Sequence, residues 1–280
     1  MSEEREPADV PDDVAHLDQA IDLLRDDPEM AQVTCALNLL GRGLSLLPQL
    51  SWSDVFANDL SAAVCLGRAY RQLRAAVTVM MSGYYAETRA LLRSVYESAG
   101  LARLLAKEPA MAEQWLRKGQ WFPEKEVRRW LKNVRGDSDE NVTHYRQHYV
   151  QMSAWPHPTF VSCFELIEPD DGHFMLRLNT RFDEQGLRSC MKEIALTAIF
   201  ACFALRNAAV KEGVIPASWR TDLYELASKV LAHDPPHLDR NWEQEQDNYN
   251  IFQRRVQAAS RLDERLDQHP ASWRNTNPQL

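Results

Sequence analysis

The fold is decided by the stretch Asp54–Lys107, DVFANDLSAAVCLGRAYRQLRAAVTVMMSGYYAETRALLRSVYESAGLARLLAK. Apolar residues recur in it at the three- and four-residue spacing of amphipathic helices. Ser82-Gly83 interrupts this spacing near the middle, and such a pair typically ends a helix. The stretch therefore predicts two long helices, one ending at about Met81 and one beginning at about Tyr84, that fold back on each other as a helical hairpin.

Helical spacing also occurs on both sides of this hairpin, and it predicts further helices at 14–24, 28–47, 110–118, 124–134, 184–211, 217–232 and 238–266. One segment differs. Residues 160–168 and 173–178 are β-biased and flank Pro169-Asp170-Asp171-Gly172, a typical hairpin turn. We therefore expect an all-α protein, an antiparallel helical bundle with one small β-hairpin insertion at about 160–178.

The domain organisation follows from composition. Hydrophobic residues make up 45% of the chain and charged residues 26%, which is typical of globular proteins and predicts a packed core. The acidic start, 1–12, and the Pro/Asn-rich end, 269–280, suit a disordered arm and a disordered tail. A single helical domain is expected over 13–268.

Charge and cysteine content limit the class of protein. A net charge of −8 argues against a protein whose whole surface binds nucleic acid or anionic lipid, although it permits a local basic patch. Five cysteines without a close-spaced pair suit reduced thiols in the cytoplasm. The start lacks the features of a signal peptide, and the longest apolar run, 194–205, is shorter than the roughly 20 residues of a membrane span. The apolar run at 194–205 therefore predicts a buried core helix.

The first candidate site lies on the second hairpin helix. Arg93 and Glu97 are four residues apart and project away from the apolar stripe, with Tyr96 near the same face. On an exposed face such a pair contributes only about 0.3–0.5 kcal/mol. If another element covers it, an arginine beside a carboxylate becomes an anchor for a phosphate, a carboxylate or a carbonyl. The alternative is a structural bridge between helices.

The second candidate site is the segment Tyr149–Pro158, which contains Ser153 and His157. His157 lies between two prolines, which restrict the backbone on both sides of it. This stiffness suits an acid/base group with a pKa near neutrality, and it equally suits a structural histidine that bonds to a helix. A nucleophilic Ser–His pair is less well supported, because the sequence shows no nucleophile elbow and no third member.

The two sites share a resemblance. Gly-Tyr-x-x-Glu and Leu-x-Arg-Ser-x-Tyr-Glu at 83–97, followed by Tyr-x-x-x-Ser-x-x-x-His-Pro at 149–158, resemble a bacterial helical family catalogued only as a domain of unknown function. The resemblance covers roughly 54–158. It implies that Arg93, Tyr96 and Glu97 meet the loop that contains Tyr149, Ser153 and His157.

A third pattern suggests RNA. Basic residues alternate with aromatic ones over Trp115–Arg135, and cations beside aromatic rings are typical of grooves for single-stranded nucleic acid. Glu124 and Glu126 reduce the positive charge of this segment, and a solvated helix surface can show the same composition. An RNA contact through 115–135 is one of the expected partners.

Metal and cofactor chemistry find little support. The chain contains no His-Glu-x-x-His, no Cys-x-x-Cys and no Gly-rich phosphate loop, and His144 with His148 lacks a clear third ligand. We therefore expect no metal and no cofactor.

Two functions remain. The first is a cytoplasmic, non-catalytic module that binds a ligand, a protein partner or a second copy of itself through Arg93, Glu97, Ser153 and His157. The alternative is a metal-independent endoribonuclease of the HEPN kind from a toxin or defence system, with Arg93 and His157 as the candidate catalytic residues. Such nucleases carry Arg-x(4–6)-His on one helix, and Arg206-Asn207 begins like that motif but has no histidine at the right distance.

Overall fold

The computed structural model describes residues 13–47, 57–135, 167–170, 173–176, 182–209 and 214–232. The helices among them confirm the all-α prediction: α1 (Asp13–Leu24), α2 (Pro28–Ser45), α3 (Ala57–Met81), α4 (Tyr85–Lys107), α5 (Pro109–Lys118), α6 (Glu124–Arg135), α9 (Glu184–Ala208) and α10 (Ala217–Ala232). The predicted arm at 1–12, the helix at 238–266 and the tail at 269–280 lie outside the described residues.

Local chemistry explains where several of these helices begin and end. The carboxylates of Asp27 and Asp183 accept hydrogen bonds from backbone N–H groups in the first turns of α2 and α9, respectively. Gly83, with φ of 84°, separates α3 from α4. There the N–H of Gly83 donates to the carbonyl of Met80, and that of Tyr84 to Val79. A left-handed residue in this position favours glycine, so the interruption at 82–83 has a structural cause.

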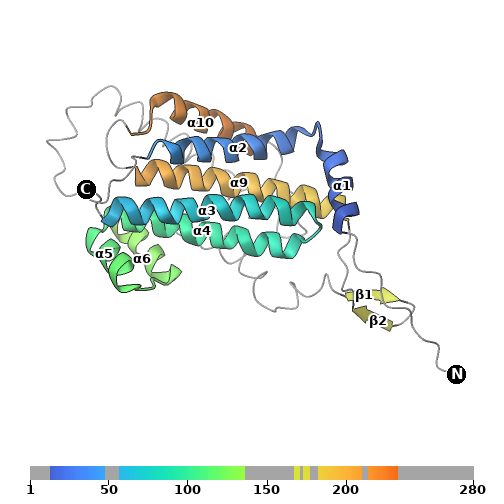
Figure 1. Ribbon diagram of the computed structural model, residues 1–280, viewed down its shortest axis with the longest axis horizontal. Coiled ribbons are helices and arrows are strands. Elements are labelled where there is room, and N and C mark those ends of the chain that lie inside the picture. The colour runs from blue at the N-terminus through green and yellow to red at the C-terminus, as the bar shows by residue number, and fades with distance from the viewer. Residues whose placement is uncertain are drawn as a thin grey trace. The chain divides into compact units, whose positions relative to one another are not determined.

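Four long helices, α2, α3, α4 and α9, pack side by side (Figure 1). Helices α3 and α4 run antiparallel. The amide of Asn58, near the start of α3, donates to the carbonyl of Ala106 near the end of α4, and Gln72 meets Ser98 midway. The two halves of the stretch 54–107 are therefore partners along most of their length.

Helix α9 departs from the antiparallel arrangement that the sequence predicted, because it runs in the same direction as α2 and α4. The N–H of Asp183 donates to Tyr85 Oη at the start of α4, and Arg188 reaches Asp27 at the start of α2. Farther along, the rings of Tyr96 and Phe200 stack. Short loops make neighbours antiparallel, but the long chain between α6 and α9 allows a return to the same end.

The core lies where α9 meets α2, α3 and α4. Most side chains of α9 between Ile194 and Leu205 are buried, which confirms the prediction of a core helix. Leu40 of α2, Leu66 and Leu73 of α3 and Leu92 of α4 are also fully buried. Among the described helices, none is long and apolar enough to cross a membrane.

Two short strands lie within the predicted hairpin, β1 (Ile167–Asp170) and β2 (His173–Leu176), paired antiparallel with Ile167 opposite Leu176. The rest of 160–178 lies outside the described residues, so a β-hairpin inserted into the bundle stays a prediction. The chain divides into two compact units, Met1–Val214 and Ile215–Leu280. In the second unit, α10 buries Trp219 and Leu223. This division does not test the prediction of one domain over 13–268.

Candidate functional site

Arg93 and Glu97 form an ion pair within α4. The Nε of Arg93 donates to Oε1 of Glu97 at 3.1 Å. The side chain of Arg93 is 17% exposed and that of Glu97 is 40% exposed. The guanidinium is therefore partly removed from water, while its carboxylate partner remains accessible.

Helix α6 packs on α4 and contributes a second ion pair near Arg93 and Glu97. Arg128 and Glu124 pair through Nε and Oε1 at 2.5 Å, and only 10% of the Glu124 side chain is exposed. The pKa of Glu124 is raised, mainly by burial and also by the negative charge of Glu97. The positive charges of Arg128 and Arg93 act in the opposite direction. Since the charges on α4 act on Glu124, the four side chains form one group, which we call the α4–α6 charge cluster.

Apolar packing holds α6 in this position. Val127 of α6 is buried against Leu104 of α4, and Trp130 packs beside them. The indole N–H of Trp130 also donates to Oε1 of Glu108 at 2.6 Å. The cluster therefore lies on a face of α4 that α6 partly covers, which limits the solvent screening of its charges.

The other predicted site residues have different outcomes. Tyr96 is buried, and its ring stacks on Phe200 of α9 with centroids 4.1 Å apart, so this side chain serves helix packing. Tyr149, Ser153 and His157 lie outside the described residues. The meeting of His157 with Arg93 therefore stays a prediction.

Sequence reasoning did not find a second arginine on α4. Arg89 donates from Nε to Glu193 of α9 at 3.1 Å, and from Nη2 to Ser189 at 3.3 Å. Its side chain is 8% exposed, and that of Glu193 is 22% exposed. Arg89 lies four residues before Arg93 in the sequence, but nothing in the spacing shows that its partner comes from a helix about a hundred residues later.

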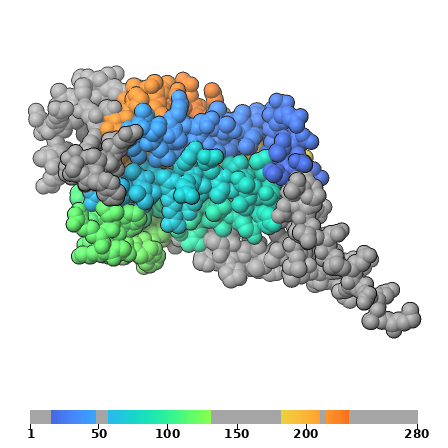
Figure 2. Space-filling model, in the orientation of Figure 1, coloured from blue at the N-terminus to red at the C-terminus, as the bar shows by residue number. Residues whose placement is uncertain are grey.

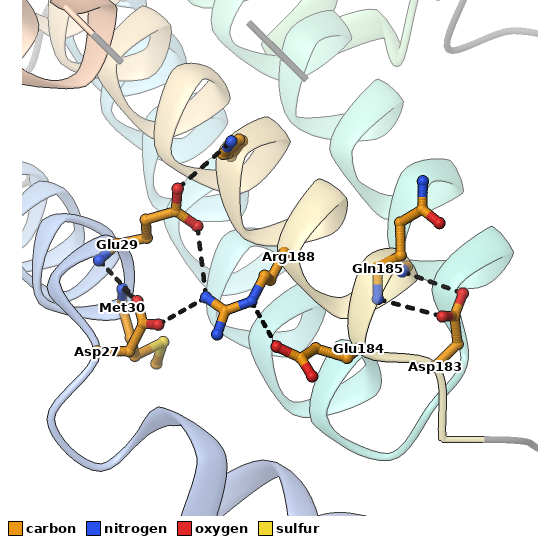
Figure 3. Close-up of polar contacts among 9 residues, drawn as sticks. Asp27, Glu29, Met30, Asp183, Glu184, Gln185 and Arg188 are labelled. Atoms are coloured by element: carbon orange, nitrogen blue, oxygen red, sulfur yellow. Dashed lines mark hydrogen bonds and ion pairs between the residues drawn. The ribbon is translucent and has the colours of Figure 1, made fainter. Parts of the chain in front are cut away.

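A further ion-pair network joins the starts of α2 and α9 (Figure 3). Arg188 lies between Asp27, at 2.7 Å, and Glu184, at 2.9 Å. Burial raises the pKa of Asp27, but the hydrogen bonds from Arg188, Met30 and Glu29 outweigh it, so the pKa lies below its usual value. Asp27 therefore both caps α2 and ties it to α9, which indicates a structural role.

The segment predicted to contact RNA is only partly accessible. Trp121 is 78% exposed, whereas Phe122 is buried and Trp130 is half-buried. Lys118, Lys125 and Arg129 are exposed, and so is Arg117, which pairs with Glu113. The described side chains of 115–135 therefore present one exposed aromatic ring and four exposed cations, on the surface of α5, α6 and the turn between them.

Within the described ranges, no group of three or more His, Cys, Asp or Glu side chains could hold a metal ion. Comparison of the chain with protein-family models, with curated proteins and with solved structures gave no match.

Proposed function

We propose that this protein is a non-catalytic helical module that binds a ligand or protein partner at the α4–α6 charge cluster. One observation supports this most directly: two Arg–Glu pairs, each local to its own helix, are brought together on a partly buried face. In such a place, charges interact more strongly than in bulk water. Arg93 would take the anionic group of a ligand, because a guanidinium matches carboxylates and phosphates in two-point contacts.

We further propose that Tyr149, Ser153 and His157 complete this site from a loop. The support is the resemblance of 83–97 and 149–158 to a bacterial helical family, together with the partly open side of Glu97. In the same proposal the bundle carries the β-hairpin insertion, and the protein works in the cytoplasm with a protein partner or a second copy of the chain.

A double-mutant cycle between Arg93 and His157 tests the spatial part. We expect Arg93→Ala and His157→Ala to be coupled by at least about 0.5 kcal/mol in the free energy of unfolding, as for residues in contact. Arg117 is the matched control, because it forms the same kind of local pair with Glu113 on α5. Additive effects for Arg93 and His157, as expected for Arg117 and His157, would contradict the proposal.

A binding measurement tests the functional part. Isothermal titration with citrate and with inorganic phosphate should show binding that Arg93→Gln weakens at least tenfold and Arg117→Gln leaves unchanged. Equal binding by both variants would remove Arg93 from the site. The purified protein should also leave total RNA intact in the presence of EDTA.

The HEPN-like nuclease remains the second proposal for the same residues. It requires Arg93 and His157 to act at one phosphate, where they would activate the 2′-hydroxyl and stabilise the charged transition state. Cleavage of RNA that persists in EDTA and disappears in both Arg93→Ala and His157→Ala would support the nuclease and contradict the binding module.

A separate observation favours an RNA contact on α5 and α6. Among the described residues, Trp121 is the large apolar side chain with the greatest exposure. Exposed cations lie on both sides of it in the sequence. Stacking of a base on an aromatic ring contributes about 1–3 kcal/mol. We expect Trp121→Ala to weaken binding of a uridine 12-mer at least fivefold, whereas Trp115→Phe, at a half-buried position, should not.

A further inference from the structure

The outer face of α2 and α3 has an unusual charge. Arg68, Arg71 and Arg74 of α3 are all exposed. There is no Asp or Glu between Leu60 and Met81, and none in α2 after Glu29. In the described part of the chain, no carboxylate pairs with these three arginines. The net charge of the chain is −8, yet among the described residues no ion pair compensates the positive charge of Arg68, Arg71 and Arg74.

The three arginines form one row, which we call the α3 arginine row. They are spaced three residues apart, so they are neighbours on the helix surface and span about 9 Å of its axis. Arg42, in the last turn of α2, is also exposed. Figure 2 shows α2 and α3 next to each other on one face of the molecule.

The helix packing underneath positions Tyr70, which contacts one arginine of the row. A Cβ at Gly41 of α2 would lie 3.2 Å from Tyr70 Oη, so the glycine lets Tyr70 fill the space between the two helices. The guanidinium of Arg74 lies over the Tyr70 ring, 5.9 Å from its centroid. A cation over an aromatic face loses part of its freedom before any partner arrives.

The chemistry of the row selects the kind of anion. Every basic residue in α2 and α3 is arginine, and the planar guanidinium binds phosphate oxygens in two-point contacts that lysine cannot make. An anionic membrane would need large apolar side chains beside the cations. Only Val64 is both large and markedly exposed on the described part of α3.

The helices α2 and α3 also offer no exposed aromatic ring on which a base could stack. Tyr70 is the only aromatic residue of α2 and α3, and its ring is half-buried beneath Arg74. Binding of single strands depends on exposed aromatic rings. A duplex needs no stacking, because it presents one phosphate charge for about every 1.7 Å of its axis. Three arginines over about 9 Å can therefore each meet a different phosphate.

We propose that the α3 arginine row binds the phosphate backbone of double-stranded DNA without reading its sequence. This surface is separate from the α4–α6 charge cluster, so the proposal does not depend on the function proposed for that cluster. The acidic remainder of the molecule would limit the contact to this face, which predicts weak, strongly salt-dependent binding.

The test is the binding of a fluorescein-labelled 20-base-pair DNA to the full-length chain between 50 and 200 mM NaCl. Each phosphate contact contributes about −0.9 to the slope of log K against log salt concentration. One contact therefore makes the affinity at 0.1 M salt about eightfold higher than at 1 M salt. We expect Arg71→Gln to weaken binding by about that factor and to flatten the slope by about 0.9. The triple variant Arg68→Gln, Arg71→Gln, Arg74→Gln should flatten it by about 2.7.

Two controls keep this measurement specific. Arg71→Lys should keep the slope, because it keeps the charge. Arg25→Gln, at an exposed arginine that follows α1 and pairs with Asp22, should change neither slope nor affinity. Thermal melts of all variants should agree with the wild type, since the substituted side chains are exposed.

Four outcomes would overturn the proposal. They are no binding at 50 mM salt, an unchanged slope in the triple variant, equal binding of a poly-glutamate 20-mer, and tighter binding of the single strand that Trp121→Ala abolishes. The third would mean that the row binds acidic protein, and the fourth would transfer nucleic-acid binding to α5 and α6.

Discussion

The ion pairs of α9 and those of α4–α6 differ in how far apart their partners lie in the sequence. Arg188 of α9 pairs with Asp27, and Glu193 pairs with Arg89, so both pairs cross between helices. In the α4–α6 charge cluster, Arg93 pairs with Glu97, and Arg128 with Glu124, each within one helix. The first set ties helices together, whereas each pair of the second set joins residues one turn apart in the same helix.

Under the proposed function, this difference separates the structural role of Arg89 from the binding role of Arg93. Arg89 and Arg93 are one turn apart on α4, have the same chemistry and are both at least partly buried. A cross-helix pair is fixed by the positions of two backbones, and losing one partner leaves a buried charge. A local pair depends on one helix only, and under the proposed function Arg93 is the group that an external anion would contact.

The largest expected effect is that of Arg89→Ala. It leaves Glu193 without its cross-helix partner, so we expect a loss of about 3 kcal/mol in the free energy of unfolding. Arg93→Ala should cost only about 1 kcal/mol or less, because its pair is local and partly exposed. Urea denaturation of both variants makes the comparison.

The double variant Arg89→Met, Glu193→Leu sharpens this result. Replacing both partners by apolar side chains removes the unpaired charge, so much of the lost stability should return. If Arg93→Ala proved as costly as Arg89→Ala, the proposed division between a structural role for Arg89 and a binding role for Arg93 would be wrong.

Asp27 should show the next largest effect. Asp27→Asn keeps a good N-cap but loses the charge that pairs with Arg188, and Asp27→Ala loses both. We expect Asp27→Asn to cost about 1–2 kcal/mol and Asp27→Ala about 1 kcal/mol more, in urea denaturation at pH 7.

The pH dependence at Asp27 has a definite sign. Its pKa is lower in the folded chain than in the unfolded one, so the carboxylate stabilises the fold above the unfolded value and loses this effect as the pH falls through the folded value. The advantage of the wild type over Asp27→Asn should therefore shrink below about pH 4. A difference that is independent of pH would show that the ion pair contributes nothing.

Gly186 permits the close approach of α9 to α4, and its replacement should have an intermediate effect. A Cβ there would lie 2.8 Å from Cδ2 of Tyr85, so we expect Gly186→Ala to cost about 1–3 kcal/mol. Gly67 of α3 has open space around it, so Gly67→Ala should stabilise the protein by about 0.5–1 kcal/mol. Thermal melts of both variants would reveal the opposite signs.

The smallest effect concerns Glu124 in the cluster. Its pKa is raised in the folded chain, so the folded state holds the proton more tightly and stability falls as the pH rises through the unfolded value of about 4.5 towards the folded value. The stability of the wild type relative to Glu124→Gln should therefore decrease over that window. An increase would mean that Arg128 outweighs burial.

The sequence predicted features that depend on neighbours in the chain. Helical spacing located α3 and α4, Gly83 marked the turn between them, and Arg93 was placed four residues from Glu97. The missed features depend on residues far apart: the direction of α9 relative to α2 and α4, the pairing of Arg89 with Glu193, and the covering of Arg93 by α6. No local pattern specifies which helix faces which. The sequence therefore predicted the residues of the site on α4 but not their arrangement in space.

The shared direction of α2, α4 and α9 has an electrical consequence. In antiparallel neighbours the helix macrodipoles oppose each other, whereas here three of them add. The first turns contain Glu29, Glu87 and Glu184, and the last turns contain Arg42, Lys107 and Arg206. Each end of the helix group thus carries side chains opposite in sign to the helix termini there. Reversing these charges at one end should therefore be more costly than in a bundle with alternating helices.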